Sequence, residues 1–78
     1  MTILDTDVLS ELMRPKPSPR VVTWVASQPA EELYTTSITE AEIFYGVELL
    51  SKGKHKERLL VAAEGLFSED LAGRVFSF

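Results

Sequence analysis

The sequence has 78 residues, no cysteine and a formal net charge of −4 at pH 7. This length limits the chain to one small domain, and the lack of cysteine excludes disulfides and thiolate metal sites, which fits a reducing cytoplasm. The acidic balance argues against a protein that holds nucleic acid by electrostatics alone, but not against a nuclease whose acidic pocket meets phosphates through bound cations.

The first predicted elements are a strand at Ile3–Leu4 and two helices. The first helix runs from about Asp7 to Arg14, where Pro15 stops it. A second helix begins after Ser18-Pro19, an N-cap and N1 pair, and ends near Gln28-Pro29. Apolar residues that share a helix face are expected to point inward: Leu9, Leu12 and Met13 in the first helix, and Val21, Val22, Trp24 and Val25 in the second.

Four further elements complete the pattern. A strand is predicted over Leu33–Ile38 and a long helix over Thr39–Lys52, with Gly53 as its C-terminal stop. Another helix follows, then a loop at Ser68–Gly73 and a third strand at Arg74–Phe78. The expected inward residues are Ile43, Val47 and Leu50, flanked by Ala41, Phe44 and Leu49, and then Leu59, Leu60, Ala63, Leu66 and Phe67.

The order of elements is strand, two helices, strand, two helices, strand. This order predicts an α/β fold with a parallel sheet and right-handed crossovers. The sequence ends inside the last predicted strand, which would leave an unpaired edge and an apolar face. We therefore expect the chain to be the front part of a larger domain. No apolar run approaches the ~20 residues of a membrane helix, and the acids near the N-terminus argue against a signal peptide.

Two acidic motifs are the best candidates for chemistry. Leu4-Asp5-Thr6-Asp7 follows the first strand, and Thr39-Glu40-Ala41-Glu42 opens the helix after the second. Both are expected at the carboxyl edge of one parallel sheet, where ligands bind in such folds. Carboxylates at that edge suit a hard cation such as Mg²⁺. Asp5 and Glu42 are therefore predicted to share a cation, with Thr6 supplying a hydroxyl.

Each of these residues also has a structural interpretation. Thr39 and Glu42 have the spacing of a capping box, which carries equal weight with a ligand role for Glu42. Asp7 is expected to be the N-cap of the first helix, and Glu40 a solvated charge in a first turn. Asp5 is expected to be partly buried, and because buried acids need a partner, a functional role is favoured for it.

The remaining candidates are a basic cluster and the tryptophan. His55 lies in Lys52-Gly53-Lys54-His55-Lys56, where a solvated position is expected rather than a catalytic base. The same cluster, with Arg58, is the best basic patch for a phosphate backbone, although a solvated face is the favoured interpretation. Trp24 is expected in the core or at an interface.

Three segments carry a family resemblance that covers nearly the whole chain, in order and with compatible spacing: ILDTDVLSELMRPKPSPRVVTWV, TTSITEAEIFYGVELLSKGKHKERL and LFSEDLAGRVFSF. The sequence resembles the PIN-domain toxins of VapBC toxin–antitoxin systems and, within them, the FitB-like group. The resemblance implies a three-layer α/β/α sandwich around a parallel sheet. Residues 1–78 would be the N-terminal portion of a single PIN domain, truncated after the third strand.

The resemblance also implies a function. Family members are Mg²⁺- or Mn²⁺-dependent endoribonucleases that act on RNA. They are cytoplasmic and do not bind membranes. A small VapB-like antitoxin inhibits them, they form homodimers or toxin–antitoxin hetero-oligomers, and they reach DNA only through the antitoxin. Asp5 matches the first metal-binding aspartate, Thr6 the hydroxyl residue beside it, and Glu42 the second acid. Asp7 falls where the family has Asn or Asp, and the remaining acids of the family lie beyond the third strand.

Two alternatives stay open at this point. Asp5-Thr6-Asp7 after an apolar strand also fits the opening motif of haloacid-dehalogenase-like phosphohydrolases, with Asp5 as nucleophile and Asp7 as general acid. In that case Glu42 has no role. The other alternative is a truncated, catalytically inactive PIN fragment that acts only as a binding partner, because a nuclease site needs several carboxylates.

Overall fold

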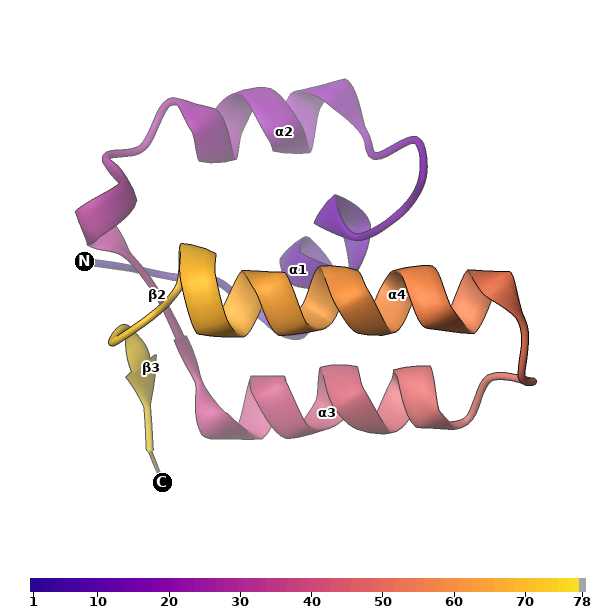
Figure 1. The fold of residues 1–78 in the computed structure, drawn as a ribbon. Coiled ribbons are helices and arrows are strands. Elements are labelled where there is room, and N and C mark those ends of the chain that lie inside the picture. Colours follow the sequence, from indigo (N-terminus) through magenta and orange to yellow (C-terminus); the bar gives the residue numbers. More distant parts are fainter. Residues whose placement is uncertain (78) are drawn as a thin grey trace.

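The structure is a computed structural model that describes residues 1–77, with three parallel strands and four α-helices in that range (Figure 1). The strands are β1 (Thr2–Ile3), β2 (Leu33–Thr36) and β3 (Val75–Phe76), and the sheet order is β1-β2-β3. Thr2 pairs with Leu33, and Thr35 pairs with Val75, both in parallel register. The predicted α/β class with a parallel sheet is confirmed.

Two pairs of helices connect these strands. Between β1 and β2 lie α1 (Thr6–Leu12), α2 (Pro19–Ala26) and a short 3₁₀ turn at Ala30–Glu32. Between β2 and β3 lie α3 (Ser37–Glu48) and α4 (Lys54–Gly65), which run side by side in opposite directions (Figure 1). A π-helical turn over Leu66–Asp70 continues α4 toward β3. This is the predicted order of elements.

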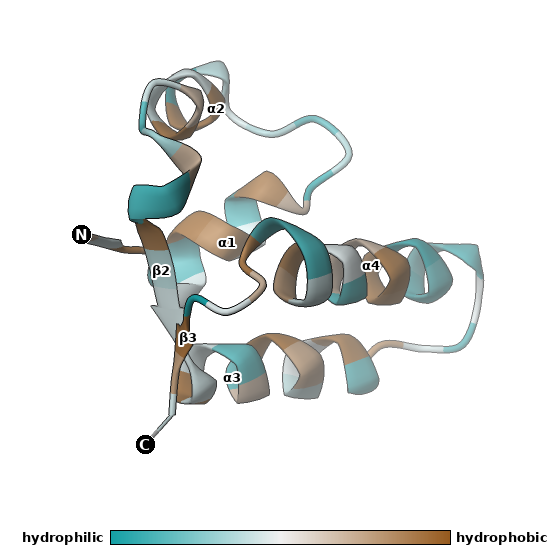
Figure 2. Cartoon of the chain, turned by 60° about the vertical axis from the view of Figure 1, so that its left-hand side comes forward, coloured by the Kyte–Doolittle hydropathy of each residue, from teal (hydrophilic) through white to brown (hydrophobic). Residues whose placement is uncertain are grey.

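The core lies between the sheet and a layer formed by α1, α3 and α4, which stand on the same side of the strands (Figure 2). Its buried members come from both ends of the chain and from α3: Leu4, Leu9, Ile43, Ala63, Phe67 and Leu71. The buried Thr35 links β2 to the residue after β1, because its hydroxyl donates to the Leu4 carbonyl at 2.8 Å. No helix within residues 1–77 is long and apolar enough to cross a membrane.

The boundaries of α3 differ from the prediction because Thr36, not Thr39, caps the helix. The Thr36 hydroxyl accepts the Thr39 N–H at 3.1 Å, so α3 begins at Ser37. The helix ends at Glu48 rather than at Lys52. Gly53 does not stop α3 but stands at the N-cap of α4 with a φ of 152°. That positive φ is accessible to glycine at little cost.

Other predicted boundaries shift by a few residues. The first strand and α1 both begin and end slightly earlier than expected, and α2 ends at Ala26. The predicted loop at Ser68–Gly73 is partly wrong, because its first residues belong to the π-helical turn. The third strand is shorter than predicted and covers Val75–Phe76, while Phe78 lies outside the described residues.

Several residues predicted to point inward are exposed. Trp24 on α2 keeps 47% of its surface, and no residue of α2 is fully buried in the described chain. Val21 and Val25 are half-buried, so only part of the apolar face of α2 packs against the rest of the protein. On α3, Ala41 is exposed while Ile43 and Val47 are buried, and Leu49, which directly follows α3, is also exposed. Of the two positions expected for Trp24, the core is therefore wrong, and an interface stays a prediction.

Candidate active site

The end of β1 delivers the first acidic residue to the carboxyl edge of the sheet. Leu4 is buried, and its N–H donates to the Tyr34 carbonyl at 2.7 Å, which extends the pairing with β2 by one residue. Asp5 follows with extended backbone (φ −90°, ψ 176°), and α1 begins at Thr6. The buried strand end thus places Asp5 at the junction between the sheet and α1.

Asp5, and not Asp7, is the N-cap of α1. An oxygen of its carboxylate (Oδ1) accepts the Val8 N–H at 3.0 Å, and Asp7 lies in the first turn. The prediction that Asp7 caps this helix is wrong, because the helix begins one residue earlier than the pattern indicated. Asp5 is also exposed rather than partly buried. Its negative charge is stabilised by the helix N-terminus rather than by a buried partner.

The acidic residue of the second motif, Glu42, contacts the first motif through the Thr6 hydroxyl. The Thr6 hydroxyl donates to Glu42 Oε1 at 2.5 Å, a contact between residues 36 positions apart in the sequence. Glu42 lies in the second turn of α3, so it cannot close the capping box that its spacing from Thr39 suggests. The capping interpretation of Glu42 is wrong, and its partner is the residue that follows Asp5.

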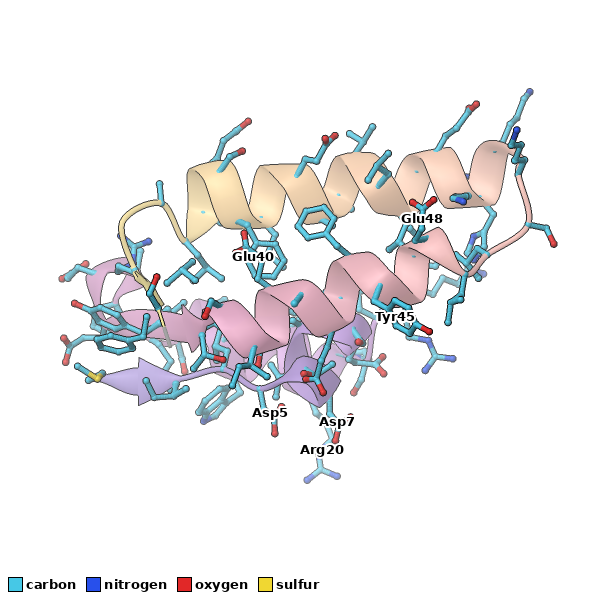
Figure 3. All side chains as sticks on the ribbon, turned by 90° about the horizontal axis from the view of Figure 1, so that it is seen from below. Asp5, Asp7, Arg20, Glu40, Tyr45 and Glu48 are labelled. Carbon is cyan, nitrogen blue, oxygen red and sulfur yellow. The ribbon has the colours of Figure 1, made fainter. Side chains whose placement is uncertain are left out.

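The other two acids of the motifs point to different places. Figure 3 shows Asp5 and Asp7 projecting on the same side of the molecule, together with Arg20 of α2. Glu40 is half-buried and borders a groove between α3 and α4 with Phe44 and Ser68. The structure therefore links Asp5 and Glu42 through Thr6, keeps Asp7 nearby and separates Glu40 from them.

The donor set of this edge suits a hard cation. Carboxylate and hydroxyl oxygens are the ligands that Mg²⁺ and Mn²⁺ prefer. Within residues 1–77, no group of three or more acidic or histidine side chains is placed to hold a metal ion. Mg²⁺ keeps several waters and binds proteins through one or two carboxylates, so the oxygen donors of Asp5, Thr6 and Glu42 are of the type that this ion takes.

The basic cluster lies elsewhere. Lys54, His55 and Arg58 are exposed on the first part of α4, at the end of the α3–α4 pair that is remote from the strands (Figure 1). Lys56 has a structural contact, because its ammonium donates to the carbonyl of Glu48, the last residue of α3, at 3.0 Å. His55 is thus solvated, as predicted.

Sequence reasoning missed Arg20. This residue and Trp24 are one helical turn apart on α2, and both border a groove whose other wall includes Val8 of α1. The available signal was the spacing of four, which places two residues on the same helix face. The sequence does not show that this face lies beside the first acidic motif, because the contact depends on how α2 packs on α1.

Comparison with known families and curated proteins places this arrangement in context. The family model described as "PIN domain" matches residues 2–73. Toxin FitB of Neisseria gonorrhoeae is 44% identical over 78 residues, all of this chain and 56% of the relative. VapC ribonuclease Y4jK of Sinorhizobium fredii and plasmid stability protein StbB of Pseudomonas syringae pv. tomato are each 38% identical over the same shares. The chain spans about half the length of these relatives.

Two solved structures have the same fold over the whole chain. The structure of FitAB bound to an IR36 DNA fragment superposes with a TM-score of 0.88 at 44% identity, covering 100% of this chain and 55% of the other. The crystal structure of FitAcB from Neisseria gonorrhoeae superposes with a TM-score of 0.79 at the same identity, covering 56% of that chain.

Proposed function

Because the chain belongs to the PIN domain family, we propose that it is the N-terminal portion of a metal-dependent endoribonuclease toxin of the VapC type. Its substrate would be the phosphodiester backbone of RNA. The observation that carries this proposal is the hydrogen bond from Thr6 to Glu42, which joins the two acidic motifs at one edge of the sheet.

Asp5 and Glu42 would hold the Mg²⁺ or Mn²⁺ ion. When bound, such an ion activates water and offsets the negative charge of a phosphate under attack. The chain's own contribution is orientation. The Val8 N–H holds the Asp5 carboxylate, and the Thr6 hydroxyl holds the Glu42 carboxylate, so both ligands are constrained before any cation arrives.

We also propose that the protein is neutralised by a VapB-like antitoxin, in the cytoplasm. It would assemble as a homodimer or as a toxin–antitoxin hetero-oligomer and contact DNA only through the antitoxin. Support comes from the relative FitB, which has been solved as FitAB with a DNA fragment.

The two alternatives make different use of the same residues. A phosphohydrolase with Asp5 as nucleophile leaves Glu42 without a role, whereas the structure ties Glu42 to the motif of Asp5. An inactive fragment that only binds a partner is favoured because, within the described residues, no three acids are placed together to hold a metal ion. That alternative predicts antitoxin binding without cleavage, so RNA cleavage by the protein separates it from the nuclease.

The direct test is Asp5→Asn in the full-length protein, assayed for Mg²⁺-dependent RNA cleavage. Asparagine caps helices as well as aspartate does, so α1 should keep its start while the site loses a charged ligand. We expect cleavage to fall by more than the roughly 100-fold typical of second-shell changes. Glu57→Gln, an exposed acid on α4, is the matched control and should cleave normally. Unchanged cleavage by Asp5→Asn would refute the proposal.

A further inference from the structure

The surface of α2 carries an unusual pair of residues. Arg20 and Trp24 border two hollows on either side of the helix, one of about 510 Å³ facing Val8 of α1 and one of about 500 Å³ that also involves Thr23. Trp24 keeps 47% of its surface exposed and is the one tryptophan of the sequence. A large aromatic ring left at the surface between two hollows is available to a ligand.

This pair lies next to the acidic edge. Val8 connects the two features, because its N–H donates to Asp5 and the same residue lines the hollow shared with Arg20 and Trp24. Figure 3 shows Arg20 projecting on the side of the molecule where Asp5 and Asp7 also project. The acidic edge and the pair on α2 are therefore neighbours through Val8.

Exposed basic residues also lie in this region. Arg14 and Lys16 precede α2, Arg20 lies in its first turn, and all three are exposed. Arg14 forms an ion pair with the Glu11 carboxylate at 3.1 Å, so its charge is partly offset within the chain. The carboxylates of the acidic edge repel a phosphodiester, and nearby cations offset that repulsion.

We propose that Arg20 and Trp24 form a nucleotide subsite for single-stranded RNA beside the acidic edge. Trp24 stacks on an unpaired base, and Arg20 contacts the adjoining phosphate. This proposal rests on the ribonuclease function proposed above and names the part of the chain that holds the strand. Stacking of splayed bases on aromatic side chains, with arginine on the backbone, is how proteins bind single-stranded RNA.

The observations favour RNA over a protein segment as the occupant. A docking site for an apolar helix needs a broad hydrophobic groove. Here the walls of the hollows are mostly apolar, with Val8, Val21 and Pro19 beside the ring of Trp24, and Arg20 one helical turn away borders both. Apolar walls around one aromatic face, with a single cation at the border, suit a stacked base and its adjoining phosphate.

The test measures RNA affinity in the Asp5→Asn background, which prevents loss of the probe by cleavage. The probe is a fluorescently labelled single-stranded RNA of mixed sequence, titrated at several salt concentrations and followed by anisotropy. Trp24→Leu keeps apolar bulk but removes the aromatic face, whereas Trp24→Phe keeps a face. Arg20→Gln removes the charge, and Arg58→Gln on α4 is the matched control at the basic cluster.

Trp24→Leu should weaken RNA binding by roughly ten- to a hundredfold, and Trp24→Phe by much less. Arg20→Gln should weaken binding and lower the slope of log affinity against log salt by about 0.7. Arg58→Gln should change neither quantity. Because Trp24 is exposed, the melting temperature of each variant should stay near that of the parent, and Trp24→Phe provides a second variant if Trp24→Leu does not fold.

Other outcomes would overturn the subsite. Equal RNA affinity for Trp24→Leu and the parent, or a loss confined to Arg58→Gln, would place RNA elsewhere. If Trp24→Leu instead weakens only the complex with a protein antitoxin, α2 is a protein interface. These failures are distinct from failure of the proposed function: Asp5-dependent cleavage with normal affinity in Trp24→Leu refutes the subsite alone, and absence of both binding and cleavage refutes both.

Discussion

The two helical connections of the sheet are built alike but packed differently. The connection from β2 to β3 places Ile43, Val47 and Ala63 in buried positions, and its π-helical turn adds Phe67. The connection from β1 to β2 buries Leu9 of α1, whereas α2 has no fully buried residue in the described chain. The second connection supplies most of the buried core residues, whereas the first adds Leu9 and leaves much of α2 exposed to solvent.

Because of this difference, most residues that stabilise the fold and most residues that can contact a ligand lie in different connections. The acidic edge has its Asp5 and Thr6 on the first connection and takes only Glu42 from the second. Residues at an exposed, lightly packed connection can contact ligands, while the second connection holds the sheet in place. Substitutions in the two connections should therefore affect different measurements.

The largest expected effect is on stability, in the second connection. Phe67 is 7% exposed and its ring lies 5.6 Å from that of Phe44. Phe67→Ala should lower the free energy of unfolding by about 3–5 kcal/mol, because it removes a large core side chain and leaves a cavity. The matched change in the first connection is Val22→Ala on α2, which should cost within about 0.5 kcal/mol because Val22 is exposed. Similar losses in denaturant unfolding would contradict the contrast.

The next effect is on metal binding, in the first connection. Thr6→Val keeps the shape of the side chain but removes the hydroxyl that holds Glu42, so Mg²⁺ affinity should fall roughly 10- to 100-fold. Thr6→Ser keeps a hydroxyl and should retain most of that affinity. Calorimetric titration with Mg²⁺ measures both, and equal affinities for the two variants would show that the hydroxyl has no positioning role.

A smaller effect separates capping from ligation on α3. Thr36→Ala removes the cap of α3 and should cost about 1 kcal/mol of stability without altering metal binding. Glu42→Ala should show the opposite, with metal binding lost and less stability change, because Glu42 does not cap the helix. Thermal unfolding together with the Mg²⁺ titration checks the pair. Greater destabilisation by Glu42→Ala would restore the capping interpretation.

The smallest expected effect is on the hydrogen bond that joins α1 to the residue before α2. The Ser18 N–H donates to Glu11 at 2.8 Å, and this bond, with the Arg14 guanidinium, holds the pKa of the Glu11 carboxyl below its ordinary value. A lowered pKa means that the ionised form stabilises the fold at neutral pH and that this contribution is lost as the pH falls through the lowered pKa.

Glu11→Gln should therefore lower the melting temperature slightly at pH 7, and the difference from the parent should shrink under acidic conditions. Melting curves at pH 7 and under acidic conditions check this. Glu31→Gln, an exposed acid before β2, is the control and should show no such trend. A difference that grows on acidification would have the wrong sign.

The order of elements and the meeting of two acidic motifs were predictable from local patterns. Apolar periodicity fixes the type of each element, and parallel strands bring their carboxyl ends to one edge. The caps were not predictable with the same ease. The segment Thr36-Ser37-Ile38-Thr39 offers several residues that can cap a helix, and the spacing from Thr39 to Glu42 matched a capping box as well as a ligand.

The errors at Trp24 and Asp5 have a shared cause. An amphipathic pattern indicates that a helix has an apolar face, but not whether that face is covered, which depends on tertiary packing. Trp24 on α2 therefore looked buried. Asp5 looked partly buried because it directly follows the buried Leu4, but it stands exposed at the N-cap of α1. The exposure of both residues depends on tertiary packing, which the local pattern does not show.

The central claim is that Asp5 and Glu42 hold a divalent cation, and paramagnetic broadening by Mn²⁺ tests it most directly. In an NMR titration of the full-length protein, the amides of residues 5–8 and of Glu42 should broaden first, while α4 amides such as that of Val61 stay sharp. Asp5→Asn should abolish this pattern at the same Mn²⁺ concentration. Broadening centred on another acidic region, or unchanged in Asp5→Asn, would contradict the claim.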